Sequence, residues 1–163
     1  TSGYIPMGAV LFNDRIAAVL RDQGGELAHG YTYSGHPVCA AVALENIRIL
    51  QDENILETCR NETGPYLAER WQALGEHPLV GEARIAGMVG ALELVPDKGV
   101  RRFFEDRGKV GALCRTMALK NGLILRATND SMLLSPPLTI NRTEIDELFE
   151  KAWKSLNETA EAI

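Results

Sequence analysis

The sequence predicts an α/β protein whose second half is a small α+β unit, and three observations carry this prediction. A glycine-rich stretch at residues 29–37 leads directly into a helix with a regular apolar face. A second helical pattern, over residues 53–74, suits a connection between domains. From residue 81 onward, short apolar segments and helical patterns follow in the order strand, helix, strand, strand, helix, which is typical of an α+β unit.

Composition narrows the classes of function. The 163 residues are 45% hydrophobic and 24% charged, enough for a domain with a sizeable core. The net charge of −5 and a pI near 5.2, with both signs interspersed, argue against nucleic-acid binding and against an anionic membrane surface. The sequence shows neither a signal-peptide pattern nor an apolar run of the roughly 18 residues that a membrane span needs. The three cysteines lack metal-type spacing and are predicted to be reduced thiols of a cytoplasmic protein.

The sequence begins in a loop without an initiator methionine, so we expect these 163 residues to be the C-terminal part of a longer chain. Residues 8–12 predict a short buried strand, and residues 13–20 a brief helix. The helix after Pro37 is indicated by apolar residues at helical spacing, namely Ala40, Ala43, Leu44, Ile47 and Leu50. In the pattern that follows, Gly64-Pro65 predicts a kink or a break.

The second half predicts a strand over residues 84–95 with a glycine kink or bulge, then a helix over 107–120. Two short strands, 123–126 and 132–135, flank a turn and predict a hairpin. A final helix begins at Asn141, which forms a capping-box pattern with a glutamate three residues later.

The stretch His29-Gly30-Tyr31-Thr32-Tyr33-Ser34-Gly35-His36-Pro37 is dense in special residues. A hydroxyl on a glycine-bracketed turn beside a helix start is a common way to offer hydrogen bonds to an anion, and Thr32 is the candidate. The alternative is an ordinary tight turn in which Ser34 caps the helix and Pro37 sits in its first turn.

Arg126 ends an apolar strand, where packing requires no cation. A guanidinium binds carboxylates through two parallel hydrogen bonds, so it suits an organic-acid substrate. The alternative is a surface or interface ion pair. No cluster of histidine, cysteine and carboxylate has metal-ligand spacing, and no lysine stands in a context typical of a desolvated nucleophile.

Three segments together resemble the class III (omega) aminotransferases, which are pyridoxal-phosphate enzymes of fold type I. They are Ser2-Gly3-Tyr4-Ile5-Pro6-Met7-Gly8-Ala9-Val10, then residues 29–37, then Gly122-Leu123-Ile124-Leu125-Arg126 with Ser135-Pro136-Pro137-Leu138. The similarity covers essentially all of the chain and is nearest to the putrescine and omega-amine:pyruvate transaminases. It implies that residues 1–50 end the large cofactor-binding domain, 51–75 form the interdomain helical connection, and 76–163 form the small C-terminal α+β domain.

The resemblance also implies roles for single residues. Thr32 is similar to the hydroxyl that reaches the pyridoxal 5'-phosphate of the other subunit in a homodimer, and Tyr31 to the neighbour that offers a backbone N–H and a ring. Arg126 resembles the mobile arginine that clamps the carboxylate of pyruvate and swings aside for a carboxylate-free amine. No catalytic residue is expected within the segment, because the family's Schiff-base lysine falls three positions before Thr1.

The implied reaction is ping-pong transfer of an amino group from an amine or omega-amino acid, with a diamine such as putrescine among the candidates, to pyruvate. An aminomutase or a dialkylglycine decarboxylase-like enzyme of the same fold is an alternative. So is a non-catalytic dimerisation module, should no lysine precede Thr1. The implied partners are the amine donor, a pyruvate-type keto acid and a second copy of the chain. A tetramer built from two such dimers is a further alternative.

Overall fold

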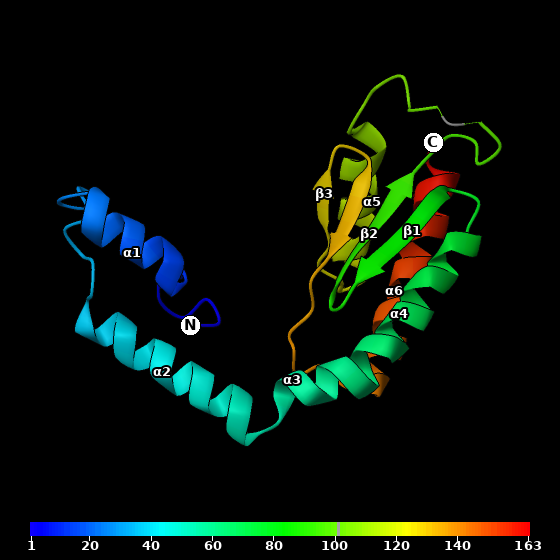
Figure 1. The fold of residues 1–163 in the computed structure, drawn as a ribbon. Helices are drawn as coiled ribbons and strands as arrows, with labels where there is room; N and C mark the ends of the chain where they lie inside the picture. Colours follow the sequence, from blue (N-terminus) through cyan, green and yellow to red (C-terminus); the bar gives the residue numbers. More distant parts are fainter. Residues whose placement is uncertain (101) are drawn as a thin grey trace. The chain divides into compact units, whose positions relative to one another are not determined.

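The computed structural model describes residues 1–100 and 102–163 (Figure 1). The chain divides into two compact units, Thr1–Glu53 and Asn54–Ile163. Within the described residues, no helix combines the length and the apolar character that crossing a membrane requires.

The first unit contains two helices, α1 (Asp14–Gln23) and α2 (Pro37–Asp52). Asn13 begins α1, because its side chain accepts a hydrogen bond from the Ile16 N–H. Pro37 stands in the first turn of α2, where its missing N–H costs nothing. Both helices were predicted. None of residues 1–53 is buried, so this unit has no core of its own.

The predicted strand at residues 8–12 is wrong. These residues form no regular structure, and Val10 and Leu11 are 85% and 89% exposed. A strand requires hydrogen bonds from a neighbouring strand, and residues 1–53 contain none. The composition of residues 8–12 identifies an apolar segment, but it does not show whether a neighbouring strand is available for pairing.

The second unit begins with a helical segment made of α3 (Ile55–Thr58), a π-helical turn (Cys59–Thr63), α4 (Gly64–Ala73) and a 3₁₀ turn (Leu74–Glu76). The helical pattern is confirmed, and its irregularity is the π-helical turn just before Gly64-Pro65 rather than a break. Three apolar residues of this segment, Leu67, Trp71 and Leu74, are buried in the core of the second unit. That core therefore takes residues from the segment expected to connect two domains.

An antiparallel four-stranded sheet, in the order β1-β2-β4-β3, forms the rest of the unit with two further helices (Figure 1). Its strands are β1 (Val80–Ala86), β2 (Val89–Leu94), β3 (Arg126–Thr128) and β4 (Ser131–Leu134), and the helices are α5 (Lys109–Lys120) and α6 (Arg142–Glu161). Alternate residues of β2 and β4 are buried, which gives the sheet one face toward the core. The core also takes residues from α4, α5 and α6.

The single strand predicted at 84–95 is instead a hairpin of β1 and β2. Ala86 pairs with Val89, and Gly87 takes a φ of 58° in the turn between them. The glycine marks a reversal of the chain, because a left-handed φ suits a two-residue turn as well as a bulge. The later hairpin is confirmed with a shorter turn, since Thr128 pairs with Ser131. The predicted capping box of Asn141 and Glu144 is present in both directions.

Candidate cofactor and substrate sites

The glycine-rich stretch forms an exposed turn between α1 and α2, at residues 32–35. Ser34 does not cap α2; its Oγ accepts a hydrogen bond of 2.9 Å from the Tyr31 N–H, while its own N–H donates to the Tyr31 carbonyl. Gly35 has a φ of 70°, which closes the turn before the helix. The serine therefore stabilises the turn itself rather than the helix end.

Thr32 is exposed at this turn, and neither its hydroxyl nor its N–H makes a hydrogen bond to any described residue. A Cβ added at Gly30 would meet no atom within 4 Å, so the backbone beside Thr32 is open to an approaching group. Two adjacent unused donors at an open turn can bind an anion. They carry no positive charge, so a phosphate held here needs further donors from other residues.

The two glycine-rich motifs of the sequence meet in the first unit. A hollow of about 520 Å³ is lined by Ile5–Gly8 from the first motif and by Tyr31, Tyr33 and His36 from the second. The ring of Tyr31 is 78% exposed and stacks edge-on against His29, with 5.6 Å between ring centroids. The second motif thus presents a hydroxyl at position 32 and aromatic rings beside it.

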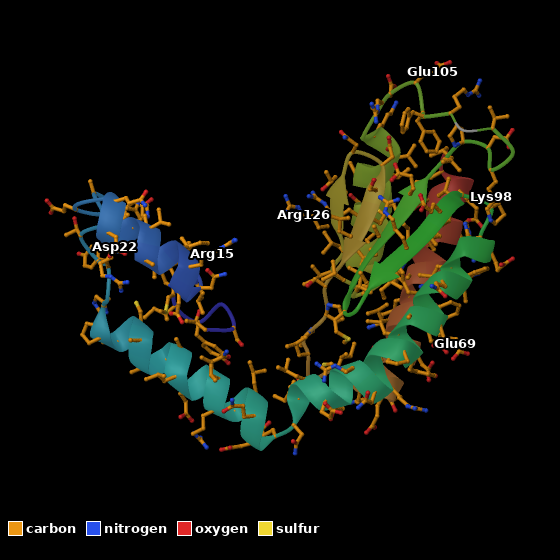
Figure 2. The ribbon with its side chains drawn as sticks, viewed as in Figure 1. Arg15, Asp22, Glu69, Lys98, Glu105 and Arg126 are labelled. Atoms are coloured by element: carbon orange, nitrogen blue, oxygen red, sulfur yellow. The ribbon has the colours of Figure 1, made fainter. Side chains whose placement is uncertain are left out.

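Arg126 is the first residue of β3, where it pairs with Leu133 of β4. It is exposed, and its side chain projects outward from the strand (Figure 2). No carboxylate of the described chain lies within ion-pair distance of its guanidinium. The preceding residue, Leu125, is 3% exposed and anchors the chain in the core. An anchored backbone with an unengaged guanidinium suits capture of a carboxylate from outside this chain.

Sequence reasoning missed Asp130, in the turn that follows Arg126. This aspartate is 4% exposed, and its two carboxylate oxygens accept hydrogen bonds from the Gly108 N–H at 2.8 Å and the Gly111 N–H at 2.9 Å. It therefore joins the β3–β4 turn to the beginning of α5. The only local signal was an Asn-Asp pair in a turn, which is common for turn chemistry alone.

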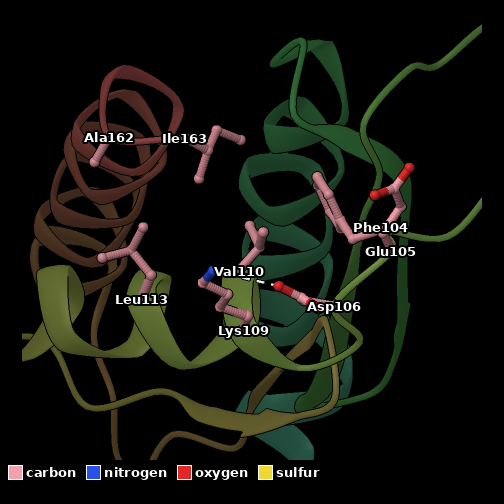
Figure 3. Close-up of a pocket in the computed structure, with 8 residues that line it drawn as sticks. All are labelled: Phe104, Glu105, Asp106, Lys109, Val110, Leu113, Ala162 and Ile163. Carbon is pink, nitrogen blue, oxygen red and sulfur yellow. Dashed lines mark hydrogen bonds and ion pairs between the residues drawn. The ribbon is translucent and has the colours of Figure 1, made fainter.

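A hollow beside α5, a buried thiol and the potential metal ligands are further features of the described residues that bear on function. A hollow of about 290 Å³ beside α5 is lined by Phe104, Val110 and Leu113, and its cation Lys109 pairs with Asp106 at 3.3 Å (Figure 3). Burial raises the pKa of the Cys114 thiol, which disfavours the reactive thiolate. The described residues contain no group of three or more potential metal ligands.

Comparison with known proteins decides the family. The family model for aminotransferase class-III matches residues 1–156. The chain belongs to the class-III aminotransferase family. Over 163 residues it is 60% identical to putrescine–pyruvate aminotransferase of Pseudomonas aeruginosa, covering 100% of this chain and 35% of that protein. Over 169 residues it is 38% identical to diaminobutyrate–2-oxoglutarate transaminase of Halomonas elongata, covering 100% of this chain and 36% of the relative.

Solved structures agree with this membership. A thermostable (S)-enantioselective omega-transaminase from Thermomicrobium roseum matches with a TM-score of 0.89 and 39% identity, over 96% of this chain and 35% of that one. The fold of this chain is thus that of the matching part of a class-III aminotransferase, which confirms the predicted α/β fold. The chain spans about a third of the length of the relatives it matches (35% and 36%).

Proposed function

We propose that the whole protein to which this chain belongs transfers an amino group from an amine to pyruvate, using pyridoxal 5'-phosphate. The observation that carries the proposal is the 60% identity, along every residue of the chain, to an enzyme named for putrescine and pyruvate. Chemically, a primary amine becomes an aldehyde while pyruvate becomes alanine. The cofactor, when bound, holds the amino group between the two half-reactions and takes up electrons from the substrate carbon.

The residues of this chain fit part of such a cofactor site. Thr32 supplies an unused hydroxyl and N–H at an open turn, as a phosphate oxygen requires. The Tyr31 N–H is donated to Ser34 Oγ, so the serine hydroxyl must rotate away before Tyr31 can donate to a phosphate. Following the resemblance to the class III aminotransferases, we propose that this turn contributes to the cofactor site of a second subunit, whose own residues would complete the phosphate contacts.

Arg126 is proposed to bind the carboxylate of pyruvate. Its fork of N–H groups matches the two oxygens of a carboxylate, and a lysine would lose this paired geometry. Since its guanidinium has no carboxylate partner in the described chain, it can engage the keto acid or turn away when an amine without a carboxylate enters. One pocket can then accept both kinds of substrate.

The domain assignment and the cellular location complete the proposal. Residues 1–50 would end the large cofactor-binding domain, 51–75 would form the interdomain helical connection, and 76–163 would form the small C-terminal domain. The chain's Cys39, Cys59 and Cys114 are free thiols, and free thiols are typical of a reducing compartment, which supports a cytoplasmic location.

Separating the two half-reactions tests this function. Full-length protein loaded with pyridoxal phosphate is mixed with an amine and no keto acid. We expect one equivalent of aldehyde per active site, then no further release until pyruvate is added, because the amino group must leave before the next turnover. Continuous aldehyde release without an acceptor would indicate a deaminating enzyme and contradict the proposal.

A further inference from the structure

We infer that Asp130 is a positioning residue for Arg126: it fixes the β3–β4 turn to α5 and so sets where the guanidinium meets a carboxylate. The inference rests on the proposed function for the role of Arg126, while the anchor itself rests on the geometry of the turn.

The strand that carries Arg126 is held by one neighbouring strand and by packing against α5. β3 is three residues long and lies at the edge of the sheet, so it has a single strand neighbour, β4. An edge strand this short keeps its place only if its ends are fixed. One end is fixed by Leu125 in the core, and the other runs into the turn at Asn129 and Asp130.

Asp130 holds that second end to two other elements. Its carboxylate binds the N–H groups of Gly108 and Gly111, at the beginning of α5, and its carbonyl accepts a hydrogen bond of 2.9 Å from the Leu94 N–H at the end of β2. A carboxylate at a helix N-terminus satisfies donors that the helix leaves unpaired and is favoured by the helix dipole. The turn is thereby tied to a helix and to a central strand.

The backbones of the β3–β4 turn and of α5 approach each other closely at this junction. A Cβ at Gly111 would collide with the carbonyl oxygen of Asn129. Gly108 takes a φ of 85° and Asn129 a φ of 50°, which are backbone conformations that residues with a Cβ rarely adopt. The close approach at Gly111 and the two positive φ angles therefore lie at one contact between the turn and α5. Asp130 makes two hydrogen bonds across this contact.

The consequence concerns substrates that carry a carboxylate. A bidentate contact requires the guanidinium to be placed to within a fraction of an ångström, whereas an acceptor without a carboxylate does not use it. A looser turn should therefore weaken pyruvate binding and leave a simple aldehyde acceptor unaffected.

The test uses full-length protein with three variants. Asp130→Asn keeps the size and one carbonyl oxygen but loses the charge, and Asp130→Ala removes both acceptors. Asp97→Asn is the matched control, because exposed Asp97 also accepts from a glycine N–H, that of Gly99 at 2.7 Å, in a different loop. Two quantities are measured: steady-state kinetics with pyruvate and with an aldehyde acceptor, and hydrogen exchange of the peptide around Gly108 and Gly111.

We expect Asp130→Asn to raise the KM for pyruvate about tenfold, and Asp130→Ala to raise it further, with kcat/KM for the aldehyde within about twofold of wild type. Exchange at Gly108 and Gly111 should be faster in both variants and unchanged in Asp97→Asn.

Equal losses with both acceptors would overturn the inference in favour of a purely structural role. Unchanged exchange in Asp130→Asn would show that the carboxylate is not the anchor, and faster exchange with an unchanged pyruvate KM would show that the anchor does not serve Arg126. A wild-type protein that cannot use pyruvate would refute the proposed function and the positioning role together, while the exchange result would still decide whether the anchor exists.

Discussion

Replacing Arg126 with alanine separates substrate recognition from folding. The side chain is exposed and has no carboxylate partner among the described residues, so its removal leaves no buried charge unpaired. We therefore expect the free energy of unfolding to change by less than about 0.5 kcal/mol. The alternative interpretation of Arg126 is a surface ion pair. In that case the substitution would break the ion pair and lower the free energy of unfolding.

The effect on pyruvate follows from the contact that is lost. A guanidinium–carboxylate pair makes two charge-assisted hydrogen bonds, and losing them should cost about 2–4 kcal/mol of transition-state binding. This is a roughly 30- to 700-fold decrease in kcat/KM for pyruvate. An aldehyde acceptor has no carboxylate to lose, so its kcat/KM should stay within about threefold of wild type.

The assay compares Arg126→Ala with Arg115→Ala in the full-length enzyme, each with pyruvate and with an aldehyde. Arg115 is likewise exposed and without an ion pair among the described residues, so it controls for the change in charge. Thermal unfolding of both variants is measured in parallel. Equal losses for the two acceptors, or a marked loss of stability in Arg126→Ala alone, would refute the reasoning.

Further predictions concern the cofactor, the core and pH. Thr32→Ala should weaken retention of pyridoxal phosphate, as measured by absorbance after dialysis, because one phosphate donor is lost. Gly90→Ala should lower the midpoint of thermal unfolding, since a Cβ there would lie 2.7 Å from Nε1 of the buried Trp71 ring; such overpacking costs about 1–3 kcal/mol. The hydrogen bond from Tyr66 to Asp146 raises the pKa of the phenol. Its stabilising contribution is therefore complete below the ordinary tyrosine pKa of about 10 and is lost as pH rises through the folded-state value. Tyr66→Phe should accordingly destabilise the protein at neutral pH and make progressively less difference in alkali.

Controls sharpen these predictions. Thr32→Ser retains a hydroxyl and should retain cofactor; in mixed dimers, Thr32→Ala should be rescued by a wild-type Thr32 that faces an intact lysine. Rescue only by a threonine on the same subunit would contradict the shared site. Gly75→Ala introduces a Cβ at an ordinary 3.4 Å from Ala83 and should leave the unfolding midpoint unchanged. A constant difference between Tyr66→Phe and wild type across alkaline pH would exclude the phenol as the titrating group.

The elements that the sequence predicted well are those whose determinants are local. Helices α1, α2, α5 and α6 were predicted from residues within or directly beside each helix. Asn13 and Asn141 cap α1 and α6, and the Asn141 capping box needs residues only three positions apart. The strands were predicted less well, because pairing depends on distant residues. Gly87 marks a reversal only when β1 and β2 lie side by side, and residues 8–12 pair with no strand among the described residues.

The same distinction applies to the sites. Thr32 and Arg126 could be singled out because their residue types and motifs point to anion binding by themselves. Asp130 could not, because its role depends on Gly108 and Gly111, which lie about twenty residues earlier in the chain (22 and 19). Its importance appears only when α5 is packed against the β3–β4 turn.

Tracing the amino nitrogen gives the clearest decision on the proposed reaction. Full-length protein loaded with pyridoxal phosphate is incubated with a nitrogen-15-labelled amine, such as putrescine, and unlabelled pyruvate, and alanine is analysed by mass spectrometry. Direct amino transfer predicts alanine that carries the label even when unlabelled ammonia is present in excess. Absence of labelled alanine, or label diluted by the ammonia, would contradict an amine:pyruvate aminotransferase.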